Sequence, residues 1–282
     1  MTINQAIQNG MQILQKNNIT TPKMKSRLLL QYTLKKSRQY IIANDNKQLT
    51  DKEEGQYFDY IKLMKSGMPL EYITHSKEFM KLNFFVDNNV LVPRQDTEIL
   101  VEEIISIAQQ NEAKHILDLC TGSGAIAVSM AKYLENVNIT AIDISKKALE
   151  IAKKNAKRNQ VENKIEFVES NMFENLDFKK YDIIVSNPPY IEREEIKKLE
   201  KEVQNEPLIA LDGGKDGLEF YRKIIKEGYK YLNPNGYIGL EIGYNQKIKV
   251  EEIIKNNNMY INTYCKKDLY DNDRIIITQL KD

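Results

Sequence analysis

The segment Asp118-Leu-Cys-Thr-Gly122-Ser-Gly124-Ala-Ile-Ala127 is the clearest indication of the fold class. It follows the apolar segment 115–119, which is typical of a buried strand, and it opens a predicted helix at 125–134. Glycines at such a turn let the backbone approach a ligand closely, and their spacing fits the pattern G-x-G-x-x-A. The stretch therefore predicts a small-molecule site at the carboxyl end of a strand in an open α/β sheet.

The segments around this stretch alternate between strand-like and helix-like apolar spacing. We predict strands over residues 115–119, 138–142, 164–168, 181–186 and 237–242, and helices from Thr97 and over 125–134, 146–158 and 217–231. Such alternation builds a parallel sheet covered by helices on both faces. Two closing strands, 259–265 and 274–280, predict an antiparallel edge hairpin. Residues 93–282 are thus a predicted seven-stranded, Rossmann-like α/β domain.

Residues 1–77 predict a small helical bundle. Their first apolar residues recur at helical spacing: Ile3, Ile7, Met11 and Leu14. A later helix is expected to begin at Thr50, because Glu53 stands three residues on in the spacing of a capping box.

A connector of β character joins the two predicted domains. Phe79 and the run 84–86 are followed, after the turn-forming residues 87–89, by the apolar run 90–92. Residues 78–92 therefore predict a β-hairpin with its turn at 87–89.

Composition limits the classes of function. The chain has 282 residues with 41 Lys and Arg against 40 Asp and Glu, so its formal net charge of +1 gives no field to attract a polyanion. No stretch approaches the roughly 18 apolar residues of a membrane span, and we expect a cytoplasmic protein. Two cysteines and two histidines are too few for a disulfide framework or a clustered metal site. The charged run 192–202 is typical of a solvated helix face.

Asp143 strengthens the prediction of a ligand site. It ends the strand after the glycine stretch, 21 residues beyond Gly122, where a carboxylate can accept hydrogen bonds from both hydroxyls of a ribose. The pair indicates an adenosine-containing cofactor, and both NAD and S-adenosylmethionine fit. The alternative is that the glycines serve only a tight turn and that Asp143 only caps the next helix.

The tetrapeptide Asn187-Pro188-Pro189-Tyr190 favours S-adenosylmethionine. It follows the buried strand 181–186, and Pro188 keeps Asn187 extended so that its side chain is aimed. An amide nitrogen is a poor nucleophile, and both of its hydrogens must be held for the lone pair to face a methyl group. The Asn187 side-chain carbonyl and the Pro188 backbone carbonyl supply two acceptors, and Tyr190 supplies a flat wall for stacking. The alternative is a rigid turn without chemistry.

At these residues the chain resembles the release-factor glutamine N(5)-methyltransferases, the PrmC/HemK family of class I methyltransferases. The resemblance covers nearly the whole chain. It rests on Glu71-Tyr-Ile-Thr74, Glu78-Phe79, Val92-Pro93-Arg94, Asp96-Thr97-Glu98, Ile116 to Ala127, Ser186 to Ile191, Glu206-Pro207 and Ala210-Leu-Asp-Gly-Gly214. The Pro-Arg-x-Asp-Thr-Glu and Glu-Pro…Asp-Gly-Gly stretches are its most specific parts.

The resemblance implies roles for the motif residues. S-adenosylmethionine, which leaves as S-adenosylhomocysteine, would be held by Thr121, Gly122, Ser123, Gly124, Ala125 and Asp143. The substrate glutamine would be held by Asn187, Pro188, Pro189 and Tyr190, with Asn187, Pro188 and Tyr190 as catalytic residues. That glutamine would belong to the Gly-Gly-Gln tip of class 1 peptide chain release factors, with the helical part gripping the release factor. We expect a monomer that binds neither nucleic acid nor membrane.

One departure from the family concerns the adenine. Where many members carry Asp-Trp or Asp-Leu after the third strand, this chain has Asn171-Met172. An amide can still bond the adenine amino group and a methionine can still pack on a ring, so Asn171 and Met172, together with Asn187, join the expected cofactor-binding residues.

Three other functions remain open. An adenine N6 DNA methylase would use the same two carbonyl acceptors for the adenine amino group. It would also need a basic region to bind phosphates, and the near-neutral net charge of the chain argues against such a region. A ribosomal-protein glutamine methyltransferase is separated only weakly by these motifs. A noncatalytic adapter would have no physical reason to retain Gly122, Gly124, Asp143 and Asn187 together.

Overall fold

A computed structural model describes residues 1–177 and 179–282 and divides the chain into two compact units. The first contains Met1–Ser76 and Leu199–Asn205, and the second contains Lys77–Lys198 and Glu206–Asp282. Within the described residues, no helix is both long and apolar enough to cross a membrane.

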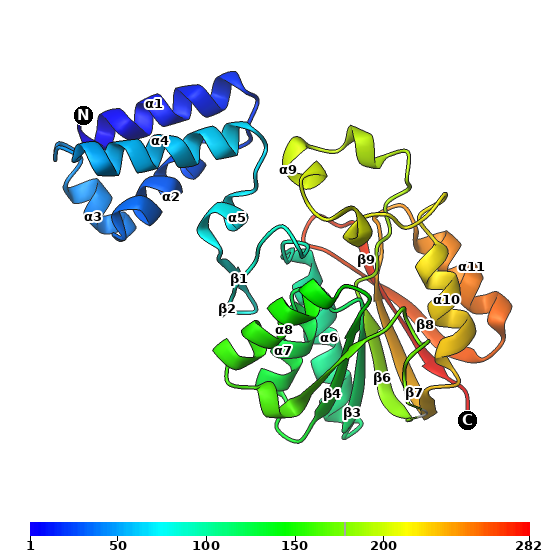
Figure 1. Cartoon of the computed structure of the whole chain (residues 1–282). Coiled ribbons are helices and arrows are strands. Elements are labelled where there is room, and N and C mark those ends of the chain that lie inside the picture. The colour runs from blue at the N-terminus through cyan, green and yellow to red at the C-terminus, as the bar shows by residue number, and fades with distance from the viewer. Residues whose placement is uncertain (178) are drawn as a thin grey trace. The chain divides into compact units, whose positions relative to one another are not determined.

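The first unit is helical (Figure 1). Its helices are α1 (Ile3–Lys16), α2 (Pro22–Leu34), α3 (Arg38–Ala43), α4 (Asp51–Lys65), α5 (Leu70–Thr74) and the short α9 (Lys201–Gln204). Helices α1, α2 and α4 pack around a shared apolar core. The predicted start of α4 is confirmed, because Thr50 and Glu53 form both hydrogen bonds of a capping box.

A hydroxyl pair lies inside this helical core. The hydroxyl oxygens of Ser26 on α2 and Tyr57 on α4 are 2.7 Å apart, and both residues are fully buried. Ser26 Oγ donates to the Ile7 carbonyl at 2.8 Å and the Tyr57 hydroxyl donates to the Ala6 carbonyl at 3.2 Å. The three helices are therefore joined by polar contacts at the point where Gly10 leaves room for the tyrosine.

The segment Leu199–Asn205 contacts the helical unit although it comes late in the chain. Glu202 accepts from the Lys25 ammonium group at 2.6 Å, and the Asn205 side chain donates to the Gly67 carbonyl at 3.0 Å. The prediction of a solvated charged face is wrong for Glu202, because Lys25 and Glu202 form a largely buried ion pair that sequence spacing cannot reveal.

The second unit begins with a hairpin of β1 (Lys77–Phe79) and β2 (Leu82–Phe84). The predicted turn at 87–89 is wrong. The turn is Met80-Lys81, where both residues have positive φ angles, +49° and +57°, as a two-residue hairpin turn demands. Residues 90–92 form no strand, and they instead lead past the pocket described below.

The seven-stranded sheet of the second unit has the order β5-β4-β3-β6-β7-β9-β8. Its strands are β3 (His115–Leu119), β4 (Asn138–Asp143), β5 (Ile165–Glu169), β6 (Tyr181–Ser186), β7 (Leu232–Glu241), β8 (Tyr260–Lys267) and β9 (Asp273–Leu280). The first five in the order pair in parallel, and β9 and β8 are antiparallel. The predicted parallel sheet and its closing hairpin are confirmed.

Helices cover both faces of this sheet (Figure 1). One face carries α6 (Asp96–Gln110), α7 (Ala125–Tyr133) and α8 (Lys146–Arg158), and the other carries α10 (Glu219–Gly228) and α11 (Lys247–Asn257). Each layer has its own buried apolar cluster. Short 3-10 turns complete the chain: η1 (Glu162–Lys164), η2 (Ile196–Lys198) and η3 (Leu208–Ala210).

Strand register places the site. Leu119 of β3 pairs with Ile142 of β4 on one side and with Ser186 of β6 on the other. The loops that follow these three strands therefore leave the sheet at the same edge, which brings the glycine stretch, Asp143 and Asn187 together.

The space around Gly10 predicts a stability difference between two glycine-to-alanine changes. A Cβ at Gly10 would lie 2.0 Å from the Tyr57 hydroxyl, whereas a Cβ at Gly55 of α4 would meet nothing within 4 Å. Gly10→Ala should lower the free energy of unfolding by about 1–3 kcal/mol through overpacking. Gly55→Ala should raise it by up to about 1 kcal/mol, because alanine favours the helix. Denaturant titration measures both, and a Gly10→Ala protein as stable as Gly55→Ala would contradict the packing described.

Candidate functional site

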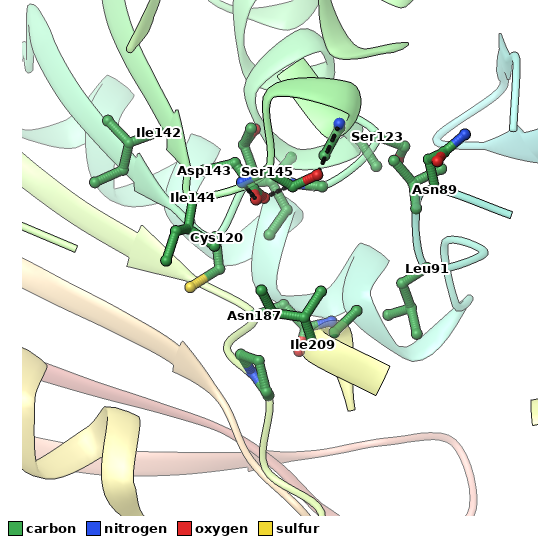
Figure 2. A pocket seen from close by; sticks show the side chains of 18 of the residues that line it. Asn89, Leu91, Cys120, Ser123, Ile142, Asp143, Ile144, Ser145, Asn187 and Ile209 are labelled. Atoms are coloured by element: carbon green, nitrogen blue, oxygen red, sulfur yellow. Dashed lines mark hydrogen bonds between the residues drawn. The ribbon is translucent and has the colours of Figure 1, made fainter. Parts of the chain in front are cut away.

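A pocket lies at the carboxyl edge of the sheet in the second unit (Figure 2). In that view Asp143 and Ile144 lie on the left, Asn89 and Leu91 on the right, and Asn187 and Ile209 below. The expected site residues that line it are Thr121, Gly122, Ser123, Ala125, Asp143, Asn171, Met172, Asn187 and Pro189. Gly124, Pro188 and Tyr190 lie outside its lining.

The glycine stretch forms a tight loop between β3 and α7. The backbone is left-handed at Cys120, Gly122 and Gly124, with φ angles of +60°, +54° and +78°. A Cβ at Gly124 would lie 3.0 Å from Ala152 Cβ on α8, so glycine also permits close helix packing. Gly124 thus shapes the loop from behind, while its neighbours face the pocket.

Asp143 fixes this loop to the next one. Its Oδ2 accepts from the Gly122 N–H at 2.9 Å and its Oδ1 accepts from the Ser145 N–H at 2.8 Å. Burial raises the pKa of Asp143, and these backbone donors oppose the rise. Each carboxylate oxygen retains a second lone pair for a ligand hydroxyl.

Asn155 ties the same loop to the segment that follows the hairpin. This fully buried side chain of α8 donates to the carbonyls of Phe85 and Ser123, at 2.9 Å each, and accepts from the Phe85 N–H at 2.7 Å. One side chain therefore satisfies three backbone groups from two separate loops. The opposite wall of the pocket, which contains Asn89, Val90, Leu91 and Pro93, begins only four residues beyond Phe85.

Asn171 and Met172 follow β5 and enter the pocket wall. The Asn171 amide donates to Glu174 Oε1 at 2.7 Å, which leaves its carbonyl oxygen for a ligand. Met172 has a φ of +56° and is almost fully buried, with its sulfur 3.8 Å from Cys120 Sγ. These two residues supply one polar and one apolar surface.

The elbow Asn187–Tyr190 leaves β6 beside this wall. The Asn187 amide nitrogen donates to Thr97 Oγ1 on α6 at 3.2 Å. The Tyr190 hydroxyl donates to Glu241 Oε1 at the end of β7 at 3.3 Å, and burial raises the pKa of that phenol. The elbow is thus held from behind at both ends.

The stretches that carry the family resemblance also contact one another within this unit. The Arg94 guanidinium forms an ion pair with Glu206, and the Val92 N–H donates to the same carboxylate at 3.0 Å. A Cβ at Gly213 would lie 2.7 Å from Tyr190 Cα, so the Asp-Gly-Gly stretch packs against the elbow backbone. These motifs support the site from behind.

Two fully buried carboxyl groups lie next to the pocket lining. Desolvation raises the pKa of Asp118 to about 7, against a hydrogen bond of 2.6 Å from Thr121 Oγ1. Desolvation likewise raises the pKa of Glu241 to about 7, against a hydrogen bond from Thr97. Both carboxyl groups therefore change protonation near neutral pH, and each accepts a hydrogen bond from a threonine that lines the pocket.

Comparisons with known proteins show the family of this chain. Family profiles described as PrmC N-terminal domain and Methyltransferase small domain match residues 5–74 and 94–206. The chain is 40% identical to the release factor glutamine methyltransferase of Clostridium acetobutylicum, with 98% of each chain covered. It is 38% identical to that of Clostridium botulinum, again with 98% of each covered. The chain belongs to the release factor glutamine methyltransferase family.

Membership in this family makes the chain a methyltransferase and confirms the predicted class I methyltransferase fold with an N-terminal helical region. A solved structure, the ribosomal protein L11 methylase of Lactobacillus delbrueckii subsp. bulgaricus, shares that fold with a TM-score of 0.52. It is 20% identical and covers 70% of this chain and 84% of its own, so the likeness concerns the fold alone.

Sequence reasoning does not single out Asn155 or Glu241. Asn155 stands among lysines on a helix, and its partners are 32 and 70 residues away. Glu241 ends an apolar strand, as Asp143 does, and this position at a strand end is the sequence feature that could have marked it as a candidate site residue. Thr97 belongs to the family-specific Pro-Arg-x-Asp-Thr-Glu stretch, but its contact with Asn187 spans 90 residues.

Loss of the Asn155 bridge should destabilise the second unit. Asn155→Leu keeps the branched side-chain shape but removes the hydrogen bonds to the Ser123 carbonyl and to the backbone of Phe85, and the free energy of unfolding should fall by about 2–4 kcal/mol. Lys153→Leu on the same helix is the matched control, since Lys153 is exposed and a surface change stays within about 0.5 kcal/mol. Denaturant unfolding of both proteins tests this expectation, and equal stabilities would refute it.

Proposed function

We propose that this protein transfers the methyl group of S-adenosylmethionine to the side-chain amide nitrogen of the glutamine in the Gly-Gly-Gln motif of class 1 peptide chain release factors, modulating translation termination. The observation that carries the proposal is that Asn187 lines the same pocket as the glycine loop and Asp143. The family supports it, because the similar proteins from the two Clostridium species are named for release factor glutamine methylation.

The pocket residues fit an adenosine-containing methyl donor. We propose that Thr121 to Ala125 and Asp143 bind its sugar and amino-acid parts, with the free lone pairs of Asp143 accepting from the ribose hydroxyls. Asn171 and Met172 would bind the adenine, the first through its free carbonyl oxygen and the second by packing on the ring. When bound, the sulfonium supplies the activated methyl group.

The elbow would orient the substrate. Asn187 Oδ1 and the Pro188 carbonyl oxygen would accept the two hydrogens of the glutamine amide, leaving its lone pair to face the methyl group. Tyr190, anchored by Glu241, would stack on the planar amide, and Pro189 would close the pocket wall. Alignment of this kind supplies part of the roughly 7–11 kcal/mol that orientation can contribute.

The partner is proposed to be a protein. Residues 5–74 match the PrmC N-terminal domain, and a helical unit of this kind would grip the release factor around its Gly-Gly-Gln loop. The near-neutral net charge of +1 gives no electrostatic reason to bind nucleic acid. We infer a cytoplasmic monomer, because release factors act where translation takes place and one chain contains both the helical and the catalytic parts.

Methyl mapping tests the function. Wild-type protein, incubated with a class 1 release factor and S-adenosylmethionine, should add one methyl group to the glutamine of Gly-Gly-Gln, as located by peptide mass spectrometry. Asn187→Ala should abolish the transfer while calorimetry shows cofactor affinity within about threefold of wild type, since the glycine loop and Asp143 still line the pocket and the main loss is substrate alignment. Methylation of a ribosomal protein or of DNA adenine instead would replace the proposed substrate, and full turnover by Asn187→Ala would refute the mechanism.

The ribose assignment predicts a binding defect. Asp143→Ala should weaken S-adenosylmethionine binding roughly 10- to 100-fold, because two hydrogen bonds to a charged acceptor are lost. Isothermal calorimetry measures the affinity, and a thermal melt confirms that the variant is folded. Glu150→Ala, an exposed carboxylate removed from α8, is the matched control and should bind like wild type. An unchanged affinity in Asp143→Ala would exclude it from the cofactor site.

A further inference from the structure

A chain of buried polar contacts runs behind the Asn187 side chain. Thr97 on α6 is 4% exposed, and its Oγ1 donates to Glu241 Oε2 at 2.5 Å. The same Oγ1 accepts from the Asn187 amide nitrogen at 3.2 Å. Glu241 is 1% exposed, so water has little access to this carboxylate and does not readily replace Thr97 as its hydrogen-bond donor.

The direction of these bonds follows from the number of available hydrogens. A threonine hydroxyl has one hydrogen, and the Glu241 carboxylate takes it. Only lone pairs then remain on Thr97 Oγ1, so the amide that meets it must present its N–H and not its oxygen. The Asn187 amide is consequently oriented with Nδ2 toward Thr97 and Oδ1 away from it.

We propose that Thr97 and Glu241 are positioning residues that fix which end of the Asn187 amide faces the substrate. This inference rests on the proposed function, in which Asn187 Oδ1 accepts from the glutamine amide. The two ends of an asparagine amide have nearly the same shape, and the final side-chain torsion is broadly two-fold. A flipped Asn187 would place its NH2 against the substrate NH2, and the acceptor would be lost.

Glu241 supports both ends of the elbow, because its Oε1 accepts from the Tyr190 hydroxyl at 3.3 Å while its Oε2 holds Thr97. Other groups face it from each neighbouring element. The Tyr221 hydroxyl of α10 donates to the backbone carbonyl of Glu241 at 3.0 Å. Arg274 of β9 attracts the Glu241 carboxylate, and Asp96 repels it. Arg274 also forms ion pairs with Asp268 and Asp96.

The orientation depends on an ionised Glu241. A protonated carboxyl group can donate to Thr97, and the threonine hydrogen is then free to turn toward Asn187 and select the flipped amide. Burial raises the pKa of Glu241 to about 7, so the carboxylate is ionised above that pH and becomes protonated as the pH falls through it. The rate of methyl transfer at saturating substrates should therefore decrease on the acid side of neutrality.

Variants at Thr97 separate orientation from structural support. Thr97→Val keeps the shape but removes the hydroxyl, and kcat for release factor methylation should fall at least tenfold, with cofactor affinity within about twofold of wild type. Thr97→Ser restores the hydroxyl and should recover most of that loss. Thr140→Val, a buried threonine of β4 outside the pocket lining, is the matched control and should keep the wild-type kcat. A folded Thr97→Val protein with wild-type kcat overturns the inference.

If Thr97→Val does not fold, the dependence of kcat on pH tests the same inference. Wild-type kcat should show an acid limb near neutrality, and Glu241→Gln, whose side chain cannot ionise, should lack it. A wild-type profile without the limb overturns the inference. So does a limb that persists in Glu241→Gln, since it would then belong to another group such as Asp118. Wild-type protein that leaves the release factor unmethylated refutes the proposed function instead, and so the two failures are distinguishable.

Discussion

Parallel strand pairing at one edge of the sheet is the constraint on which the site depends. Leu119, Ile142 and Ser186 lie side by side in the hydrogen-bonded ladder of β3, β4 and β6. Because parallel strands all end at the same edge, three loops distant in sequence converge there with no contact of their own being required. The Thr121 N–H donates to the Ile142 carbonyl of β4 at 2.9 Å, which continues this pairing two residues beyond the end of β3 and into the pocket wall.

Polar side chains buried behind the pocket convert this convergence into a defined geometry. Asp143, Asn155 and Glu241 each satisfy groups from two different segments, so none of the loops can move alone without leaving a buried polar group unpaired. The pocket face, in contrast, retains free acceptors on Asp143, Asn171 and Asn187. A site that binds a cofactor and aligns a weak nucleophile needs both features: a rigid hydrogen-bonded support behind the pocket and free acceptors that face the ligand.

The segment between the elbow and the Glu-Pro stretch contributes to both compact units of the chain. The chain leaves the α/β unit after Lys198, contributes Leu199–Asn205 to the helical unit, and returns at Glu206. The return is held by Arg94 and by the Val92 N–H on Glu206. The segment that begins at the proposed substrate-binding elbow is therefore also a structural part of the unit that matches the PrmC N-terminal domain.

Most helices and strands, the class of the sheet and the motif residues could be predicted from the sequence alone, because periodicity, capping and glycine or proline geometry are local properties of the chain. The predicted hairpin turn is wrong, since positive φ angles at Met80 and Lys81 are not typical of those residue types. The contacts between distant polar groups, in contrast, are visible only in the folded chain. The Thr97–Glu241, Asn155–Phe85 and Lys25–Glu202 contacts join residues 70 to 177 positions apart, and hydrogen bonds over such separations depend on how layers pack, which no local pattern encodes.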